Sequence, residues 1–266
     1  MYLSSLLIDV GDNPDRPRPG RQWLRNLYHV HQRLCMAFPS VSRKSDDADF
    51  LKPFKPEDFG NGQVQVERAA DSGFLFRIDP RLGGRAVILV QSAVKPDWEY
   101  AFHNAGHLLA ASPEMNSFEP RFTKGQRLRF RLVANPTKKI DTIRKEERLN
   151  CTKEELIEKK GRNGKRVPVP TDQLIDWLAR RAESGGFSID KDSTTFQPGY
   201  IYMKKNKTRG GDGSRLRSVR YEGVLEVSDP DSFRNTLIHG IGSGKAFGFG
   251  LLSVAPVNTS ISEEAT

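Results

Sequence analysis

The hydrophobic pattern near the N-terminus predicts a strand followed by an amphipathic helix. Residues 2–9 form a short run with β propensity that ends in a segment rich in turn-forming residues, 11–20. Between residues 21 and 38, apolar side chains recur at steps of three and four, the spacing of one helical face. These side chains are Trp23, Leu27, Val30, Leu34 and Phe38.

Further strands are predicted along the first half of the chain. Residues 74–78 and 86–90 flank a turn rich in glycine and proline, which favours a hairpin. Residues 98–102 are a candidate second helix, and residues 126–133 alternate basic and apolar side chains, as a half-buried strand does. The charged segment 40–70 is predicted to be a loop. The first half therefore has the order β-α-β-β-α-β, the ferredoxin-like arrangement.

The second half is predicted to repeat this order after a charged connector at 139–166. Asp229 and Pro230 mark the start of a helix whose Phe233 and Leu237 face inward. The other expected elements are a strand at 167–169, a helix capped by Thr171 that runs to about Ala182, hairpin strands at 200–203 and 219–227, and a last strand at 249–254. The sequence thus predicts an α+β protein of tandem ferredoxin-like (RRM-like) βαββαβ domains, residues 1–138 and 139–266.

Composition indicates the class of partner. The 42 Lys and Arg residues outnumber the 33 Asp and Glu residues and give a net charge of +9, which favours polyanions such as nucleic acid. The alternative is a merely basic surface. The two cysteines form no metal-binding spacing or disulfide framework. No apolar run is long enough to span a membrane, and the N-terminus lacks the features of a signal peptide. We therefore expect a cytoplasmic protein without a metal or cofactor.

Tyr28 and His31 are the first candidates for chemistry. At about 100° per residue, His31 lies about 40° from the centre of the apolar stripe and Tyr28 about 100° from it, while His29 faces solvent. An imidazole and a phenol one turn apart at the edge of a buried face suit proton transfer or substrate positioning. The alternative is a half-buried histidine that only satisfies its hydrogen bonds.

A glycine-rich loop at 240–250 is the second candidate site. It is not a Walker A loop, because Ala246 follows Lys245 where that motif needs Ser or Thr. Gly242, Gly244 and Lys245 can instead approach a phosphate backbone. The alternative is a chain reversal that needs several positive φ angles. His103 and His107 are four residues apart, but no third metal ligand is identified, so their spacing is ascribed to chance.

Basic residues are interleaved with aromatic ones in the second half. Lys204 and Lys205 follow Tyr200 and Tyr202, a combination that suits base stacking and phosphate contact with RNA. A solvated surface is the alternative for any single cluster.

These motifs together resemble the CasE family of CRISPR-associated endoribonucleases. The matching segments are 1–4, 28–31, 126–132, 134–138, 164–167 and 240–256. The resemblance implies tandem ferredoxin-like domains that bind the hairpin of precursor CRISPR RNA and cut at its 3′ base. Cleavage would need no metal and would leave a 2′,3′-cyclic phosphate and a 5′-hydroxyl. The enzyme would then stay on the mature crRNA and join the other subunits of Cascade.

The resemblance also assigns roles to residues. Tyr28 and His31 match the catalytic tyrosine and histidine of the family, with His31 as general base, general acid or both. Some relatives have a lysine where this chain has Met36, so Arg33 and Lys245 remain candidates for stabilising the transition-state charge. The predicted RNA contacts are Lys165, Arg166, Arg129, Arg131, Lys138, Lys204, Lys205, Gly242, Gly244 and Lys245.

Two other functions remain open from the sequence. One is a non-catalytic RNA-binding subunit of a CRISPR ribonucleoprotein complex, and the other is a general basic nucleic-acid-binding protein. The presence of both Tyr28 and His31 favours the enzyme.

Overall fold

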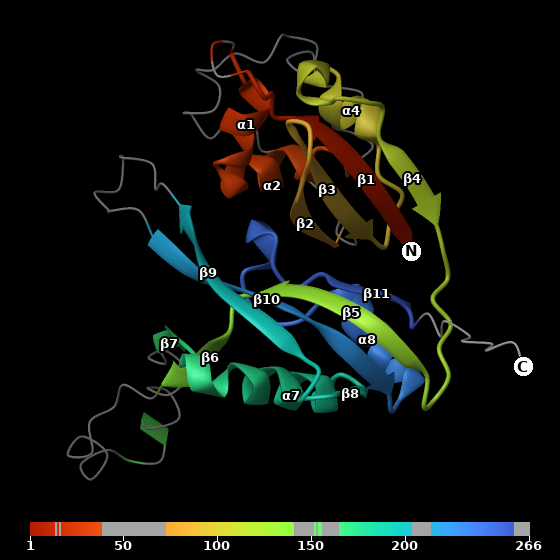
Figure 1. The fold of residues 1–266 in the computed structure, drawn as a ribbon, viewed down its shortest axis with the longest axis vertical. Coiled ribbons are helices and arrows are strands. Elements are labelled where there is room, and N and C mark those ends of the chain that lie inside the picture. The colour runs from red at the N-terminus through yellow and green to blue at the C-terminus, as the bar shows by residue number, and fades with distance from the viewer. Residues whose placement is uncertain are drawn as a thin grey trace, which may run out of the picture.

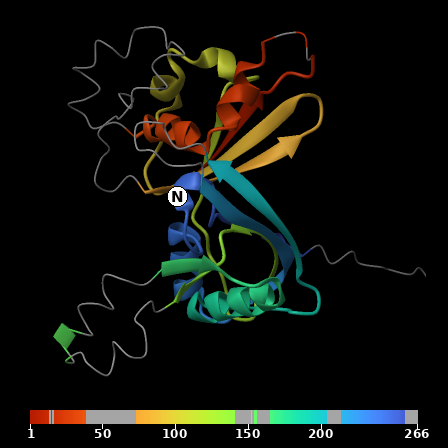
Figure 2. The ribbon, with the colours of Figure 1, turned by 90° about the vertical axis from the view of Figure 1, so that its left-hand side faces the viewer.

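Two α+β domains lie one above the other in the computed structural model (Figures 1 and 2). The structure describes residues 1–13, 15, 17–38, 73–140, 152, 154, 155, 165–203 and 214–257. The predicted loop at 40–70 lies outside these residues, as does most of the charged connector at 139–166. Among the described helices, none is both long and apolar enough to cross a membrane.

The first domain is built on a four-stranded antiparallel sheet with the order β2-β3-β1-β4. Its strands are β1 (Tyr2–Asp9), β2 (Phe74–Arg81), β3 (Arg85–Ser92) and β4 (Glu114–Ser117). The helices are α1 (Pro19–Leu24), α2 (Leu27–Cys35), α4 (Trp98–Phe102) and the 3-10 turn η3 (Gly106–Leu108). β1 and β2, which are joined through α1 and α2, lie on either side of β3. β3 and β4, which are joined through α4, lie on either side of β1. This is the ferredoxin-like topology.

The single helix predicted for residues 21–38 is in fact two helices. Asn26 has extended backbone angles, φ −114° and ψ 93°, and its side chain accepts hydrogen bonds from the backbone N–H groups of Tyr28 and His29. Asn26 is therefore the N-cap of a separate α2. In α1, a Cβ atom on Gly20 would lie 1.9 Å from the carbonyl oxygen of Asp9, so only glycine lets this helix approach β1 so closely.

The second domain repeats the topology. Its sheet has the order β11-β5-β10-β8, and β9 also pairs with β10. Its strands are β5 (Arg127–Ala134), β8 (Phe187–Ile189), β9 (Thr195–Met203), β10 (Ser214–Val227) and β11 (Leu252–Pro256). The helices are α7 (Leu174–Ser184) and α8 (Pro230–His239), with the 3-10 turns η4 (Thr171–Gln173) and η6 (Lys245–Phe247). The predicted tandem ferredoxin-like fold is confirmed.

One strand belongs to a different domain from the one predicted. β5 was expected to close the first sheet, but it opens the second, where it pairs with β10 and β11. Leu128, Phe130 and Leu132 pack into the same core as α7 and α8, which fixes β5 there. The short strand β4 closes the first sheet instead. Sheet membership therefore changes between β4 and β5, not at residue 138.

The strand predicted at 167–169 also has a different role. β7 (Lys165–Pro168) pairs with β6 (Thr137–Ile140) in a separate two-stranded sheet. Thr171 begins the turn η4 and makes no side-chain cap; its hydroxyl accepts a hydrogen bond from Arg217 Nη2 at 2.6 Å. The β9–β10 hairpin and the Asp229 cap of α8 are as predicted, and the last strand starts three residues later than expected, at Leu252.

The first sheet contacts β11 and the end of α8 in the second domain. Arg77 on β2 donates to Ser253 Oγ on β11 at 2.8 Å, and Gln91 on β3 donates to the carbonyl oxygen of Leu237 at 2.5 Å. Arg77 and Gln91 are both buried. These hydrogen bonds hold the first domain, and therefore α2, in a defined position over the second.

Candidate active site and nucleic-acid interface

His31 lies on α2 and packs against two aromatic rings of β2. Its imidazole stacks on Phe74, with ring centroids 5.4 Å apart, and on Phe76 at 6.3 Å. One turn further along the helix, the Cys35 sulfur lies 3.6 Å from Nε2 of His31. The first strand of the hairpin and the last turn of α2 therefore fix the orientation of the imidazole ring.

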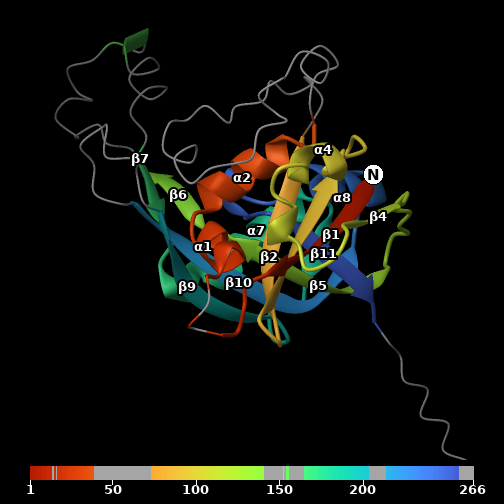
Figure 3. The same ribbon diagram turned by 90° about the horizontal axis from the view of Figure 1, so that it is seen from above.

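Tyr28 lies one turn before His31 on α2 and is 45% exposed. Its phenol is therefore accessible to a substrate while its backbone N–H is bound by the Asn26 cap. The turn η6 of the glycine-rich loop packs against α2 and β2, although it comes from the second domain. Figures 1 and 3 show this short blue turn beside α2. The structure thus brings Lys245, which is exposed on η6, next to the helix that carries Tyr28 and His31.

Burial distinguishes the positions considered for the stabilising cation. Arg33 is 3% exposed, and its Nη1 donates to the carbonyl oxygen of Ala101 and to Oδ1 of Asn104, both at 2.9 Å. Burial lowers the pKa of Arg33 to about 10. Met36 is also buried, at 4%. Arg33 is thus a structural residue, and Lys245 is the exposed cation among these positions.

The glycine-rich loop owes its composition to its backbone. A Cβ atom on Gly244 would lie 2.9 Å from the Phe249 ring, and Gly244 itself has a φ of 81°, where other residues are strained. Positive φ angles occur at five of its glycines: Gly240, Gly242, Gly244, Gly248 and Gly250. The chain reversal therefore accounts for these glycines without a ligand, and contact with RNA by Gly242 and Gly244 stays a prediction.

Lys138 and Arg166 are exposed on the β6–β7 sheet, beside the start of the glycine-rich loop. Arg166 Nη1 donates to Thr137 Oγ1 at 3.4 Å, and Thr137 in turn lies 3.2 Å from Ser243 Oγ. The backbone of Lys165 belongs to β7, but its side chain is outside the described part. Lys204 and Lys205 are also outside the described residues.

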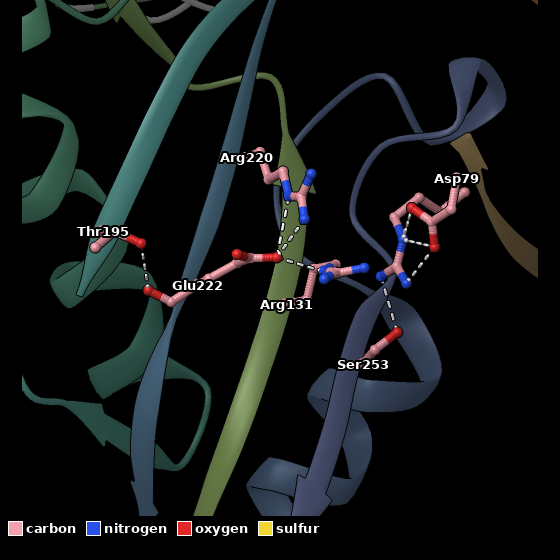
Figure 4. Close-up of polar contacts among 7 residues, drawn as sticks. Asp79, Arg131, Thr195, Arg220, Glu222 and Ser253 are labelled. Atoms are coloured by element: carbon pink, nitrogen blue, oxygen red, sulfur yellow. Dashed lines mark hydrogen bonds and ion pairs between the residues drawn. The ribbon is translucent and has the colours of Figure 1, made fainter. Parts of the chain in front are cut away.

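Arg129 and Arg131 lie on a different surface from Arg166. They line a cavity of about 590 Å³ on the helix-free face of the second sheet, together with Arg77 of the first domain. Figure 4 shows the polar network there, in which Glu222 accepts hydrogen bonds from Arg131 at 2.5 Å and from Arg220 at 2.6 Å. The structure does not bring Arg129 and Arg131 together with the other predicted RNA contacts.

The charge of Arg131 is matched by Glu222. Burial alone would raise the pKa of the Glu222 carboxyl, but hydrogen bonds and charge attraction from Arg220 and Arg131 outweigh it and hold the pKa below its usual range. Arg131 is thus part of an ion-pair network, whereas Arg129 is exposed.

His103 and His107 do not share one helix. His103 is the C-cap residue that follows α4, and His107 lies in the next turn, η3. Among the described residues, no group of three His, Cys, Asp or Glu side chains could hold a metal ion.

The sequence analysis did not predict the aromatic rings packed against His31 or the contact of Cys35 with His31. Phe74 and Phe76 carried a signal, because residues two apart on a strand share a face. Cys35 is four residues after His31 and therefore on the same side of a helix. The sequence did not predict that β2 packs against this face of α2.

The fold and site define a class of protein with two ferredoxin-like domains, in which a histidine and an exposed tyrosine on the first-domain helix meet a glycine-rich loop of the second domain. The family model described as "CRISPR associated protein" matches residues 1–256. The chain therefore belongs to this family of CRISPR-associated proteins.

Curated relatives and solved structures agree with this assignment. The chain is 34% identical to the CRISPR-associated endoribonuclease Cse3 of Thermus thermophilus, over 96% of this chain and 100% of that protein. It is 28% identical to the CRISPR system Cascade subunit CasE of Escherichia coli, over 97% and 100%. A structure of CRISPR endoribonuclease Cse3 bound to a 19 nt RNA is similar with a TM-score of 0.66 at 30% identity, covering 96% of this chain and 100% of that one.

Proposed function

We propose that this chain is an endoribonuclease that binds the repeat hairpin of precursor CRISPR RNA and cuts at its 3′ base. Its membership of the family supports this, as do relatives named as an endoribonuclease and as a Cascade subunit. The observation that carries the proposal is that α2, which carries Tyr28 and His31, packs against η6, which carries Lys245.

The proposed reaction needs no metal ion. The ribose 2′-oxygen attacks the adjacent phosphorus while its proton passes to a base, and the bond from phosphorus to the 5′-oxygen breaks. The departing oxygen takes up a proton, which leaves a 2′,3′-cyclic phosphate and a 5′-hydroxyl. A histidine suits both proton transfers, because an ordinary pKa of about 6.5 keeps both protonation states accessible near neutral pH.

The three residues have distinct proposed roles. His31 acts as general base, general acid or both, and the stacked Phe74 and Phe76 rings orient its imidazole. Tyr28 orients the 2′-hydroxyl or the phosphate, since its phenol is exposed one turn before His31. Lys245 stabilises the negative charge that develops on the phosphorane. After cleavage the protein stays on the mature crRNA and joins the other Cascade subunits.

Cleavage of a labelled repeat hairpin in EDTA tests this proposal. Wild-type protein is expected to cut at one site, and His31→Ala to bind with similar affinity but not to cut. His29→Ala is the matched control on the same helix. Its imidazole contacts the Asn26 side-chain nitrogen, whereas the cap uses the Asn26 oxygen, so the control preserves α2.

The other outcomes distinguish the alternatives. Specific binding without cutting by the wild type would indicate a non-catalytic RNA-binding subunit. Equal cutting by wild type and His31→Ala would place the active site elsewhere. Binding without preference for the hairpin, with a steep dependence on salt, would indicate a general nucleic-acid-binding protein.

A further inference from the structure

A polar cavity of about 400 Å³ lies where the β6–β7 sheet, α7 and the glycine-rich loop meet. It is separate from α2 and belongs to the second domain. Its lining includes Thr137 of β6, Arg166 of β7, Trp177 and Arg181 of α7, and Gly242 and Ser243 of the loop.

Two arginine side chains give the described lining of this cavity a positive charge. None of its lining residues is acidic, and among the described residues neither Arg166 nor Arg181 has a carboxylate partner. Within the described residues, the Arg166 side chain donates one hydrogen bond, from Nη1 to Thr137 Oγ1, and it is long, at 3.4 Å. Both guanidinium groups therefore keep most of their donors available.

Arg181 is held beside the cavity by the indole of Trp177. Its guanidinium carbon lies 5.9 Å from the centroid of that ring, within the range of a cation–π interaction. Trp177 is 4% exposed, and its Nε1 has no acceptor within the described part of the chain. Trp177 Nε1 and the guanidinium N–H groups are all hydrogen-bond donors, which suits an anion.

Neutral groups complete the lining. The hydroxyls of Thr137 and Ser243 lie 3.2 Å apart, and Ser243 donates to the carbonyl oxygen of Asn135 at 3.4 Å. At Gly242 a Cβ atom would lie 3.3 Å from the Trp177 ring, so the loop backbone runs directly against the indole. The two guanidinium groups at one opening match the acceptors of a phosphate group, whereas the protons of both hydroxyls are used within the protein.

We propose that this cavity binds one backbone phosphate of the RNA and that Arg181 is a principal contact. The inference rests on the proposed function, since it concerns a contact to the same RNA at a distance from the cleaved bond. It adds Arg181 to the predicted RNA contacts and gives Arg166 a defined partner group. Bound there, the phosphate would anchor the duplex beside the β6–β7 sheet.

Binding of the labelled hairpin to Arg181→Gln tests the inference, with the His31→Ala background preventing cleavage. We expect binding to weaken about tenfold and the slope of log affinity against log salt to fall by about one. Arg180→Gln is the matched control, because it removes the same charge from the same helix but at a position near Asp176. We expect this control to retain the affinity of the parent at the salt concentration used.

Hairpins with single methylphosphonate substitutions then locate the phosphate. One substitution is expected to weaken binding to the parent but not to Arg181→Gln, because the contact is already lost in that variant. If every substitution weakens binding equally in both proteins, the inference is overturned. The proposed function is judged separately, since specific binding and cutting by the wild type would still support it.

A titration with inorganic phosphate at constant ionic strength tests whether the cavity binds free phosphate and not a phosphate of the RNA. Tryptophan fluorescence reports occupancy, and Trp177→Phe identifies the part of the signal that comes from this cavity. A response to millimolar phosphate without any coupling between Arg181 and the RNA would mean that the cavity binds free phosphate, which would also overturn the inference.

Discussion

Arg33, Met36 and Lys245 occupy three different environments around the same part of the first domain. Arg33 is buried and donates to Ala101 and Asn104, so its charge serves the fold. Met36 lies in the apolar core. Lys245 is exposed on η6, which packs against α2. Burial therefore decides which of these positions can face a substrate, and charge type alone does not.

Replacing Lys245 with glutamine is expected to slow cleavage about 100-fold, because it removes the cation that we propose stabilises the transition state. Binding of the hairpin should weaken by no more than about tenfold. Single-turnover cleavage and a binding titration on the same RNA measure the two effects. Lys124→Gln, on the exposed turn before β5, is the control. Equal losses in binding and cleavage would show that Lys245 acts in binding alone.

Introducing lysine at Met36 is expected to lower the free energy of unfolding by about 3 kcal/mol, because it buries a charge with no partner. Met36→Leu should change it by less than about 1.5 kcal/mol, since volume and polarity are kept. Urea denaturation measures both. A stable Met36→Lys protein that cleaves faster would mean that this side chain reaches the active site.

The candidate active site depends on α2 being a separate element. Its axis is set by the Asn26 cap at one end and by packing on β2 and η6 along its length. The break between α1 and α2 lets each helix adopt its own direction over the sheet. As a result, Tyr28 lies in the first turn of a helix, close to the cap.

Removing the cap by Asn26→Ala is expected to destabilise the protein by about 1 kcal/mol, because two backbone N–H groups lose their acceptor. Cleavage should fall as well, since Tyr28 N–H is one of those groups. Thermal unfolding and cleavage measure the change. Asn26→Asp keeps the acceptor and adds a charge that favours a helix N-terminus, so it should restore both properties. Loss of cleavage in Asn26→Asp would contradict a role limited to capping.

At the scale of the whole molecule, the site depends on the docking of two domains. Tyr28 and His31 come from the first domain and Lys245 from the second, so their relative positions follow from contacts between the sheets. Arg77 is central to these contacts, because it is buried, bound to Asp79 on its own strand and hydrogen-bonded to Ser253 of the second domain.

Arg77→Met is expected to lower the free energy of unfolding by about 2 kcal/mol, because Asp79 loses its partner in a largely buried place. Cleavage should also fall, since the domains lose a link beside the site. The double variant Arg77→Met/Asp79→Asn should recover part of the stability but not the link to Ser253. Chemical denaturation and cleavage assays measure these effects, and unchanged cleavage in Arg77→Met would mean that this contact does not position the site.

Strong local patterns predicted most elements but not their partners. The period of apolar residues gave the N-terminal helices, and the turn residues gave the hairpins and the start of α8, because these signals act over a few residues. β4 was missed, since a four-residue edge strand with one apolar residue, Met115, carries no such pattern. β5 was recognised as a strand and assigned to the wrong domain, because alternation reveals that a strand has a buried face without identifying the core that covers it.

The sequence by itself determined the candidate residues for the chemistry. Tyr28, His31 and Lys245 were identified from residue type, helical spacing and the resemblance to a known family. Only the tertiary structure decided that Arg33 and Met36 are buried, that Arg129 and Arg131 lie in a different cavity from Arg166, and that Arg181 stands beside Arg166. The physical reason is that chemical type and local propensity are encoded residue by residue, whereas burial and proximity arise when segments distant in the chain pack together.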